Sequence, residues 1–253
     1  MKEEPPAKPR RLRLGKLHWW ILALFLAICG YQAWREYDYR AAIREAKEAG
    51  FEWGSTDTFD LIRQDWRAAF RKETWGKHEI ILHTGDVRDL GRYRDLIHRL
   101  RPTDLEISQC ENVGVIKGLT SLRRLGIFGC PDLQNLDLLK GLTGLQIIYF
   151  SNCPALRSVD AVKGLGDLRE FSLANCPGIQ NVDVLKDLFR LQMVCFYDCP
   201  SLQNVDALKG LTELRELRLT FCKNIPASAL RELRLALPNT DITFPDGRSI
   251  PPE

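Results

Sequence analysis

The sequence of 253 residues predicts a solenoid of the α/β class, in which short strands stack side by side into one parallel sheet. Two observations predict this fold. A pattern of apolar residues ending in cysteine recurs from residue 105 onward, and its cysteines stand 23 residues apart over four successive intervals. A second repeated segment separates these strand candidates and returns the chain to the start of the next copy. Neither segment can bury its apolar side alone, so stacked copies must share one continuous core.

Residues 1–16 form a polar leader, in which six Lys or Arg side chains stand among three prolines. The next segment, residues 17–34, contains no Asp, Glu, Lys or Arg. About 18 apolar residues are the lower limit for a membrane-spanning helix. The aromatic residues near its ends resemble interfacial anchors: they are Trp19, Trp20, Tyr31 and Trp34.

We therefore predict an uncleaved transmembrane anchor at 17–34. A cleaved signal peptide is the main alternative, but small residues before a cut are scarce there. A lipoprotein cut before Cys29 would place the bulky Ile28 where a small residue is expected. A buried core helix is the third interpretation, and it fits poorly beside a basic, Pro-containing leader.

The distribution of basic residues predicts the orientation of this anchor. Six Lys or Arg precede it, and four follow it closely, mixed with acidic residues. Cytoplasmic flanks carry the excess of Lys and Arg. We expect a single-pass membrane protein with a cytoplasmic N-terminus and an extracytoplasmic repeat domain.

Residues 35–100 read as a partly helical, membrane-proximal region that caps the repeats. Residues 37–50 combine good helix formers with a terminal Gly50, which is a common stop signal. Residues 59–75 place apolar side chains at three- and four-residue spacing, as one face of a helix does. Residues 79–85 are a strand candidate, and 86–100 look helical.

Residues 101–227 hold the repeats, in which five copies share one register. The copies are Leu119-Leu122-Leu125-Ile127-Cys130, Leu142-Leu145-Ile148-Phe150-Cys153, Leu165-Leu168-Phe171-Leu173-Cys176, Leu188-Leu191-Val194-Phe196-Cys199 and Leu211-Leu214-Leu217-Leu219-Cys222. An earlier partial copy ends at Cys110 and has lost three residues after its cysteine. The pattern L-x-x-L-x-L-x-x-C-x-x-L with a period of roughly 20–29 residues is the leucine-rich repeat signature. From about residue 105 to 244 the chain resembles a leucine-rich repeat protein.

The return segments share an Asp followed by a Lys three positions later. We expect each Asp to cap a short helical turn, because a carboxylate accepts hydrogen bonds from free backbone N–H groups. These predicted caps are Asp137, Asp160, Asp183 and Asp206. A calcium-binding ladder is the alternative, and the neighbouring ladder of lysines weakens it.

Residues 228–253 are predicted to close the core with a final helix, a strand and a polar tail. Ser228 can begin the helix, and Pro238 stops it. The segment 241–244 is the strand candidate. Atypical terminal repeats are expected where a solenoid must be sealed.

Six of the eight cysteines occupy one repeated position, at which the side chain turns inward at the end of a strand. We predict that they are structural free thiols: Cys110, Cys130, Cys153, Cys176, Cys199 and Cys222. Disulfides between neighbours are disfavoured because parallel side chains in register point the same way. A linear column also cannot supply four converging ligands to a metal. Cys195 departs from this pattern, and we expect it to be the accessible thiol.

Strand side chains alternate between faces, so the inward positions of the repeat define the outward, concave ones. Aromatic and methionine side chains among the outward positions are typical of a protein interface. The candidate partner-binding residues are Arg124, Phe128, Ile147, Tyr149, Asn152, Glu170, Ser172, Asn175, Met193, Cys195, Tyr197, Asp198, Glu216, Arg218 and Phe221. Isolated exposed apolar residues are also common on ordinary surfaces, which is the alternative interpretation.

In the order of its parts the chain is also similar to a group of bacterial membrane-anchored leucine-rich repeat proteins. These have a basic leader, one span, a short helix ending in Gly-Phe-x-Trp (Gly50, Phe51 and Trp53 here) and then the repeats. The resemblance implies protein–protein interaction. The 23-residue period and the Cys-Pro loops depart from the 22-residue Asn repeats of internalins, so their adhesion role is not carried over.

The expected function is a membrane-anchored scaffold that binds a protein partner through its concave face. The alternative is a non-catalytic targeting or regulatory subunit of a membrane-associated enzyme complex. No nucleophile elbow, phosphate-binding loop or HExxH motif is present, so no catalytic residue, cofactor, metal or small-molecule substrate is expected. The formal net charge of only +3 argues against nucleic-acid binding, which needs a strongly basic surface.

Overall fold

A computed structural model describes residues 38–49 apart from 39, 40, 43 and 47, and then 52–53, 81–83, 90–109, 112–247 and 249–250. The predicted anchor at 17–34, the predicted helix at 59–75 and Cys110 lie outside these residues. Within the described part, no helix has the length and apolar character needed to cross a membrane.

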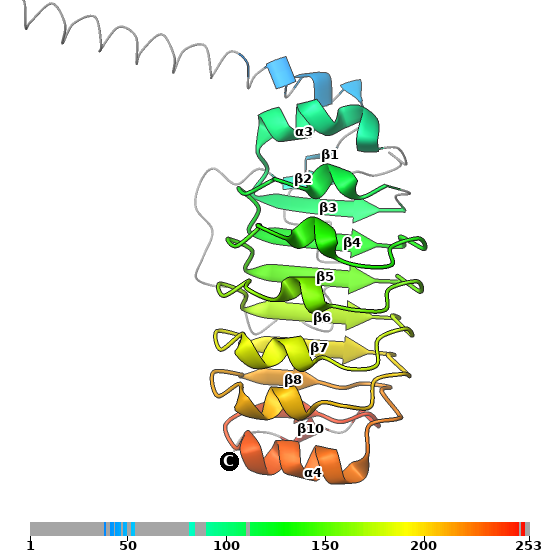
Figure 1. The fold of residues 1–253 in the computed structure, drawn as a ribbon, viewed down its shortest axis with the longest axis vertical. Helices are drawn as coiled ribbons and strands as arrows, with labels where there is room; N and C mark the ends of the chain where they lie inside the picture. Colours follow the sequence, from blue (N-terminus) through cyan, green and yellow to red (C-terminus); the bar gives the residue numbers. More distant parts are fainter. Residues whose placement is uncertain are drawn as a thin grey trace, which may run out of the picture.

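The described strands form one ten-stranded sheet whose order in space is their order in the chain (Figure 1). They are β1 (Glu52–Trp53), β2 (Ile81–His83), β3 (Asp104–Ser108), β4 (Arg124–Phe128), β5 (Ile147–Ser151), β6 (Glu170–Ala174), β7 (Met193–Tyr197), β8 (Glu216–Arg218), β9 (Asp241–Thr243) and β10 (Ser249–Ile250). All pairs from β2 to β9 are parallel, whereas β1 and β10 pair antiparallel at the two ends.

Short helical segments return the chain from each strand to the next and line the other side of the solenoid (Figure 1). The 3-10 helices are η1 (Leu90–Tyr93), η2 (Gly114–Ile116), η3 (Asp137–Leu139), η4 (Asp160–Val162), η5 (Asp183–Asp187) and η6 (Asp206–Gly210). The α-helices with defined bounds are α3 (Arg94–Leu100) and α4 (Ala227–Ala236).

The strand register confirms the parallel sheet and the repeat period read from the sequence. Leu125 of β4 pairs with Ile148 of β5, which pairs with Phe171 of β6. The shortened first copy keeps the same register, since Leu105 of β3 pairs with Leu125. Residues at the same position of neighbouring copies therefore pair with each other across adjacent strands. Their inward side chains stack directly on each other in the core.

The core runs between the sheet and the return segments along the whole array. Phe150, Phe171 and Phe196 are its largest fully buried side chains, one from each of β5, β6 and β7. The rings of Phe171 and Phe196 meet edge to face with centroids 6.3 Å apart. Burial of one such side chain contributes about 1.5–3 kcal/mol.

A turn in the left-handed backbone conformation follows each central strand. We call the residues at this turn the corner column; they are Gln109, Gly129, Asn152, Asn175, Asp198 and Phe221, with φ between 47° and 65°. Each corner N–H donates a hydrogen bond to the next unit along the sheet, as Asn152 does to the carbonyl of Ala174 at 3.0 Å. The turn redirects the chain so that the following cysteine points inward.

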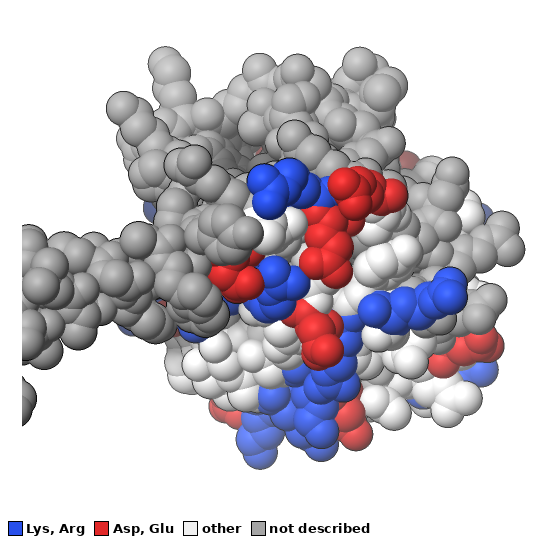
Figure 2. All heavy atoms as spheres, turned by 90° about the horizontal axis from the view of Figure 1, so that it is seen from above, with Lys and Arg blue, Asp and Glu red and all other residues white. Residues whose placement is uncertain are grey.

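The helical residues of the 38–49 segment close the N-terminal end of the core. Ala42 and Ala46, four residues apart and thus on one helix face, are fully buried in the same cluster as Ile97 of α3. Arg99 of α3 binds the carboxylates of Asp38 and Glu45 at 2.8 and 3.0 Å. Figure 2 shows positive and negative side chains interleaved at this end of the molecule.

The C-terminal end is closed by α4 and by β9 with β10. The helix begins at Ala227, one residue before the predicted start, and Pro226 occupies the N-cap position without a side-chain cap. It ends at Ala236, before Pro238, as expected because the residue preceding proline disfavours the helical conformation. Leu233 of α4 and Ile242 of β9 are fully buried over the last repeat.

Candidate functional site

The outward side chains of β4–β8 and the corner column form the concave face, which holds the predicted partner-binding residues. Their rows follow the strand register: Tyr149 pairs with Ser172, which pairs with Cys195, which pairs with Arg218. At the centre of the face, the outward side chains of the strands contact one another and leave little exposed surface. At its edge, the side chains at the carboxyl ends of the strands and at the corners are more exposed.

The centre is closed by polar contacts within the face itself. The Tyr149 hydroxyl donates a hydrogen bond to the Glu170 carboxylate, and the Arg218 guanidinium donates to Glu216. Near β3 the guanidinium of Arg124 lies 3.3 Å from the carboxylate of Asp104. The charges of the centre are therefore largely neutralised by their neighbours.

Four of the predicted contact residues are nearly buried. Arg124, Ser172, Met193 and Cys195 have exposed fractions of 6%, 5%, 4% and 1%. The expectation that Cys195 is the accessible thiol is therefore wrong. Although it points outward from the sheet, Ser172 and Arg218 flank it on the adjacent strands. Burial raises the pKa of this thiol, and the positive charge of Arg218 opposes the rise.

The edge at the carboxyl ends of the strands stays more open. Asn152 and Asp198 are exposed and Asn175 is half-buried. The Asn175 side-chain amide donates to the Asn152 side-chain oxygen at 2.9 Å, which makes a short amide ladder. Further along the edge, the ring of Tyr197 at the end of β7 meets the ring of the corner residue Phe221 edge to face, with centroids 5.2 Å apart.

Phe221 is unusual within the corner column. The left-handed conformation suits Gly, Asn and Asp, and costs other L-residues about 1–2 kcal/mol. Phe221 adopts it at φ 61° while 43% of the residue remains exposed. Its edge-to-face contact with Tyr197 contributes about 0.5–1.5 kcal/mol, which only offsets that cost.

Phe128 contributes a second aromatic side chain to the face, and its ring folds back over Gly126. A Cβ placed on Gly126 would lie 2.7 Å from Cε2 of the ring. The missing side chain at Gly126 thus makes room for Phe128, which is half-buried.

The five described cysteines of the predicted column are free and buried: Cys130, Cys153, Cys176, Cys199 and Cys222. Each thiol lies 3.4–3.8 Å from the backbone carbonyl oxygen two residues earlier in the chain. A hydrogen bond to Cys176 raises the pKa of the Cys153 thiol, and burial raises it further. The pKa of the Cys199 thiol is raised in the same way, by a hydrogen bond to Cys222 and by burial.

The predicted Asp caps are corrected by the structure. Asp137, Asp160, Asp183 and Asp206 are the first residues of their 3-10 helices, and none follows a side-chain-capped position. In three copies the backbone N–H of this Asp instead donates to a side-chain oxygen two residues earlier, on Asn135, Ser158 or Asn204. The Asp carboxylates lie in the first turn, which favours negative charge.

Two of the lysines three residues later form ion pairs with these Asp side chains on the protein surface. Lys140 pairs with Asp137 at 2.8 Å and Lys209 pairs with Asp206 at 2.7 Å. The hydrogen bond that the Lys209 ammonium donates to the Asp206 carboxylate also raises the pKa of Lys209. Among the residues that the structure describes, no group of three or more His, Cys, Asp or Glu could hold a metal ion.

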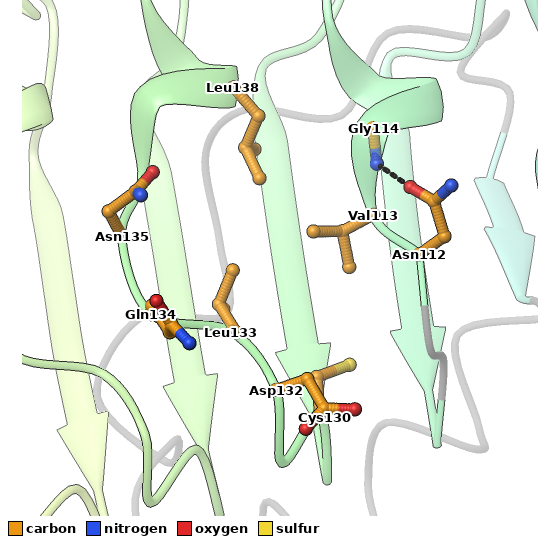
Figure 3. A pocket seen from close by; sticks show the side chains of 9 residues that line it. All are labelled: Asn112, Val113, Gly114, Cys130, Asp132, Leu133, Gln134, Asn135 and Leu138. Carbon is orange, nitrogen blue, oxygen red and sulfur yellow. Dashed lines mark hydrogen bonds between the residues drawn. The ribbon is translucent and has the colours of Figure 1, made fainter.

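A hollow of about 330 Å³ lies where the first copy lacks three residues. Val113 points into it from one return segment, and Leu133 and Leu138 point into it from the next (Figure 3). Leu133 is 6% exposed, whereas its counterpart Leu156 in the next copy is fully buried. The shortened loop is the sequence signal that could have predicted this hollow.

Asp104 is the residue that the sequence reasoning missed. It lies at the same level of β3 as Arg124 does on β4. Alignment of the two copies at their 20-residue offset would have placed these opposite charges side by side.

Comparison with known protein families identifies the repeats. Residues 120–231 match the BspA type leucine-rich repeat region, in six copies. The chain shows no significant similarity to a curated protein sequence.

Similar solved structures include an internalin and an internalin C2 from Listeria monocytogenes, each at 18% identity, with TM-scores of 0.45 and 0.46. The alignments cover 58% and 65% of this chain, and 45% and 69% of those chains. A leucine-rich repeat protein from Leptospira interrogans is 17% identical with a TM-score of 0.47, over 65% of this chain and 49% of that one. The chain thus spans about half the length of two of these proteins.

Proposed function

Because this chain is a leucine-rich repeat protein over residues 120–231, we propose that it is a membrane-anchored scaffold that binds a protein partner through its concave face. The aromatic side chains of that face carry the proposal. Phe128, Tyr149 and Tyr197 are half-buried on outward positions of the sheet, and Phe221 is exposed beside them. Aromatic residues are enriched in protein interfaces, and a solenoid presents them over an extended surface.

The membrane part of the proposal rests on the sequence. An apolar segment at 17–34 follows a basic leader, and the excess of Lys and Arg on the leader side favours a cytoplasmic N-terminus. The docked helical residues at 38–49 then lie only a few residues beyond the anchor, so the N-terminal end of the solenoid faces the membrane. The proposed role is binding, without catalysis by the chain itself.

Membrane attachment is tested by fractionation of cells that express the full chain. The protein should stay in the membrane pellet after a high-salt or alkaline wash and should be released by detergent. Protease added outside the cytoplasmic membrane should cleave the repeat domain. Release by salt alone would contradict the anchor, and protection of an anchored repeat domain would contradict the orientation.

The binding face is tested by crosslinking the full chain in its own cells and identifying the crosslinked protein by mass spectrometry. The double variant Tyr149→Ala, Tyr197→Ala should lose the crosslinked partner while its circular dichroism spectrum stays unchanged. Phe189→Ala is the matched control, because Phe189 is an aromatic residue that is 63% exposed and precedes β7 rather than facing outward from it. If the double variant still captures the partner and Phe189→Ala does not, the interface lies outside the concave face.

A further inference from the structure

Aromatic, acidic, amide and hydroxyl side chains gather at the edge of the concave face near its C-terminal end. We call this the edge patch, and it consists of Asn175, Tyr197, Asp198, Thr220 and Phe221. Tyr197 is the last residue of β7, and Asn175, Asp198 and Phe221 are corners; Thr220 lies in the turn after β8, directly before the Phe221 corner. The inference rests on the proposed function, since it specifies where on the concave face the partner binds and what the partner carries.

The first argument is the choice of residue at position 221. The corner conformation is occupied elsewhere by Gly129, Asn152, Asn175 and Asp198, which tolerate it well, and by Gln109 in the shortened first copy. A bulky aromatic residue in this conformation is a backbone outlier, and such outliers cluster at ligand contacts. Phe221 also remains 43% exposed, so burial in the core does not explain its presence.

The second argument is the charge next to this aromatic pair. Asp198 is exposed, and the structure gives its carboxylate no ion pair among the described residues. The acidic groups of the closed centre differ in this respect, since Glu170 and Glu216 are each bound to a neighbour. The edge patch therefore presents an exposed carboxylate without an ion pair among the described residues, next in sequence to Tyr197 and one corner away from Phe221.

We propose that the edge patch binds a protein segment that carries a Lys or Arg next to an aliphatic or aromatic side chain. The cation pairs with the Asp198 carboxylate and lies against the Tyr197 and Phe221 rings, whose faces attract positive charge. The apolar neighbour packs on the exposed part of Phe221. The Asn175 amide and the Thr220 hydroxyl supply hydrogen bonds to the backbone of the segment.

The test selects short random peptides from a display library on the full chain held in detergent. The selected peptides should be enriched in Lys or Arg adjacent to an apolar residue. Phe221→Asn should weaken their binding roughly tenfold or more, as loss of an interface anchor does. Asp198→Asn should weaken binding and reduce its dependence on salt.

Phe221→Asn separates a binding role from a folding role, because Asn is the residue at two other corners, 152 and 175. The variant should keep or raise the thermal midpoint of unfolding while losing the peptides. Phe189→Asn is the matched control, and it should leave binding unchanged. A lower thermal midpoint in Phe221→Asn together with unaltered peptide affinity would show that Phe221 serves folding alone.

The other outcomes are equally informative. Selection of acidic peptides, or binding that is indifferent to Asp198→Asn, overturns the proposed partner chemistry. Peptides that are lost in Tyr149→Ala but retained in Phe221→Asn overturn the edge patch and leave the concave-face function standing. Peptides that are insensitive to all of these substitutions overturn both.

Discussion

The guanidinium of Arg124 lies 3.3 Å from the carboxylate of Asp104, and both side chains are more than nine-tenths buried on the outward side of the sheet. The two residues lie side by side on β3 and β4, where the shortened first copy joins the regular repeats. The Thr103 hydroxyl also donates a hydrogen bond to Asp104 at 2.9 Å. The pair therefore stabilises the array and is too buried to contact a partner.

Removal of one partner of this pair should strongly destabilise the protein. Asp104→Asn leaves the buried Arg124 charge without its counterion, and we expect a loss of about 3–5 kcal/mol in the free energy of unfolding. Urea denaturation followed by circular dichroism measures it. The double variant Asp104→Val, Arg124→Ile should lose much less, because Ile occupies the equivalent position 147 in the next copy. Equal losses in the single and double variants would show that the ionic contact is unimportant.

Substitution of Arg99 should loosen the N-terminal cap and leave the repeats intact. The Arg99 side chain is 36% exposed, so its pairs with Asp38 and Glu45 are screened, and Arg99→Ala should cost only about 0–1 kcal/mol. Hydrogen exchange should nonetheless become faster at residues 41–48. Arg94→Ala, an exposed arginine on the same helix, is the control. Unchanged exchange in Arg99→Ala would mean that burial of Ala42 and Ala46 alone holds the cap.

Thiol modification should be slow at every cysteine that the structure describes, including Cys195. All six are buried and free, and burial raises the pKa of the Cys195 thiol, which keeps the reactive thiolate scarce. Mass spectrometry after treatment with iodoacetamide should show modification of these sites only once the protein is denatured. Rapid labelling of Cys195 in the folded protein would contradict its burial beneath the neighbouring side chains.

Two glycines should respond oppositely to replacement by alanine. A Cβ on Gly178 would lie 2.3 Å from the backbone oxygen of Leu156 in the preceding copy, so Gly178→Ala should destabilise by about 1–3 kcal/mol. No atom lies within 4 Å of a Cβ on Gly166, so Gly166→Ala should be neutral or slightly stabilising. Thermal unfolding compares the two. A neutral Gly178→Ala would indicate that the turn after Cys176 can shift away from the preceding copy.

The repeat period predicted the sheet because period and register are the same property in a solenoid. Once Cys130 and Cys153 were aligned, the inward and outward positions of β4 and β5 followed from strand alternation. The period did not predict which outward side chains are covered. That depends on the reach of the neighbours, as with Cys195 between Ser172 and Arg218.

Local chemistry was also ambiguous at the turns. Asn204 and Asp206 can both cap a helix, and only the backbone conformation decides that Asn204 accepts the hydrogen bond and Asp206 becomes the first helical residue. The left-handed conformation of Phe221 could not be predicted from the sequence either, because an aromatic residue does not favour a left-handed turn.

The antiparallel strands at the two ends of the sheet have a consequence for assembly. Stacked identical units can in principle grow without limit, since each parallel strand offers its neighbour the same edge. Here β1 and β10 reverse direction, and each is only two residues long. Residues 251 and 252, which follow β10 in the sequence, are prolines without an N–H to donate. Within the described sheet, the two end strands therefore do not offer the long parallel edge that the inner strands share, which disfavours end-to-end polymerisation into fibres.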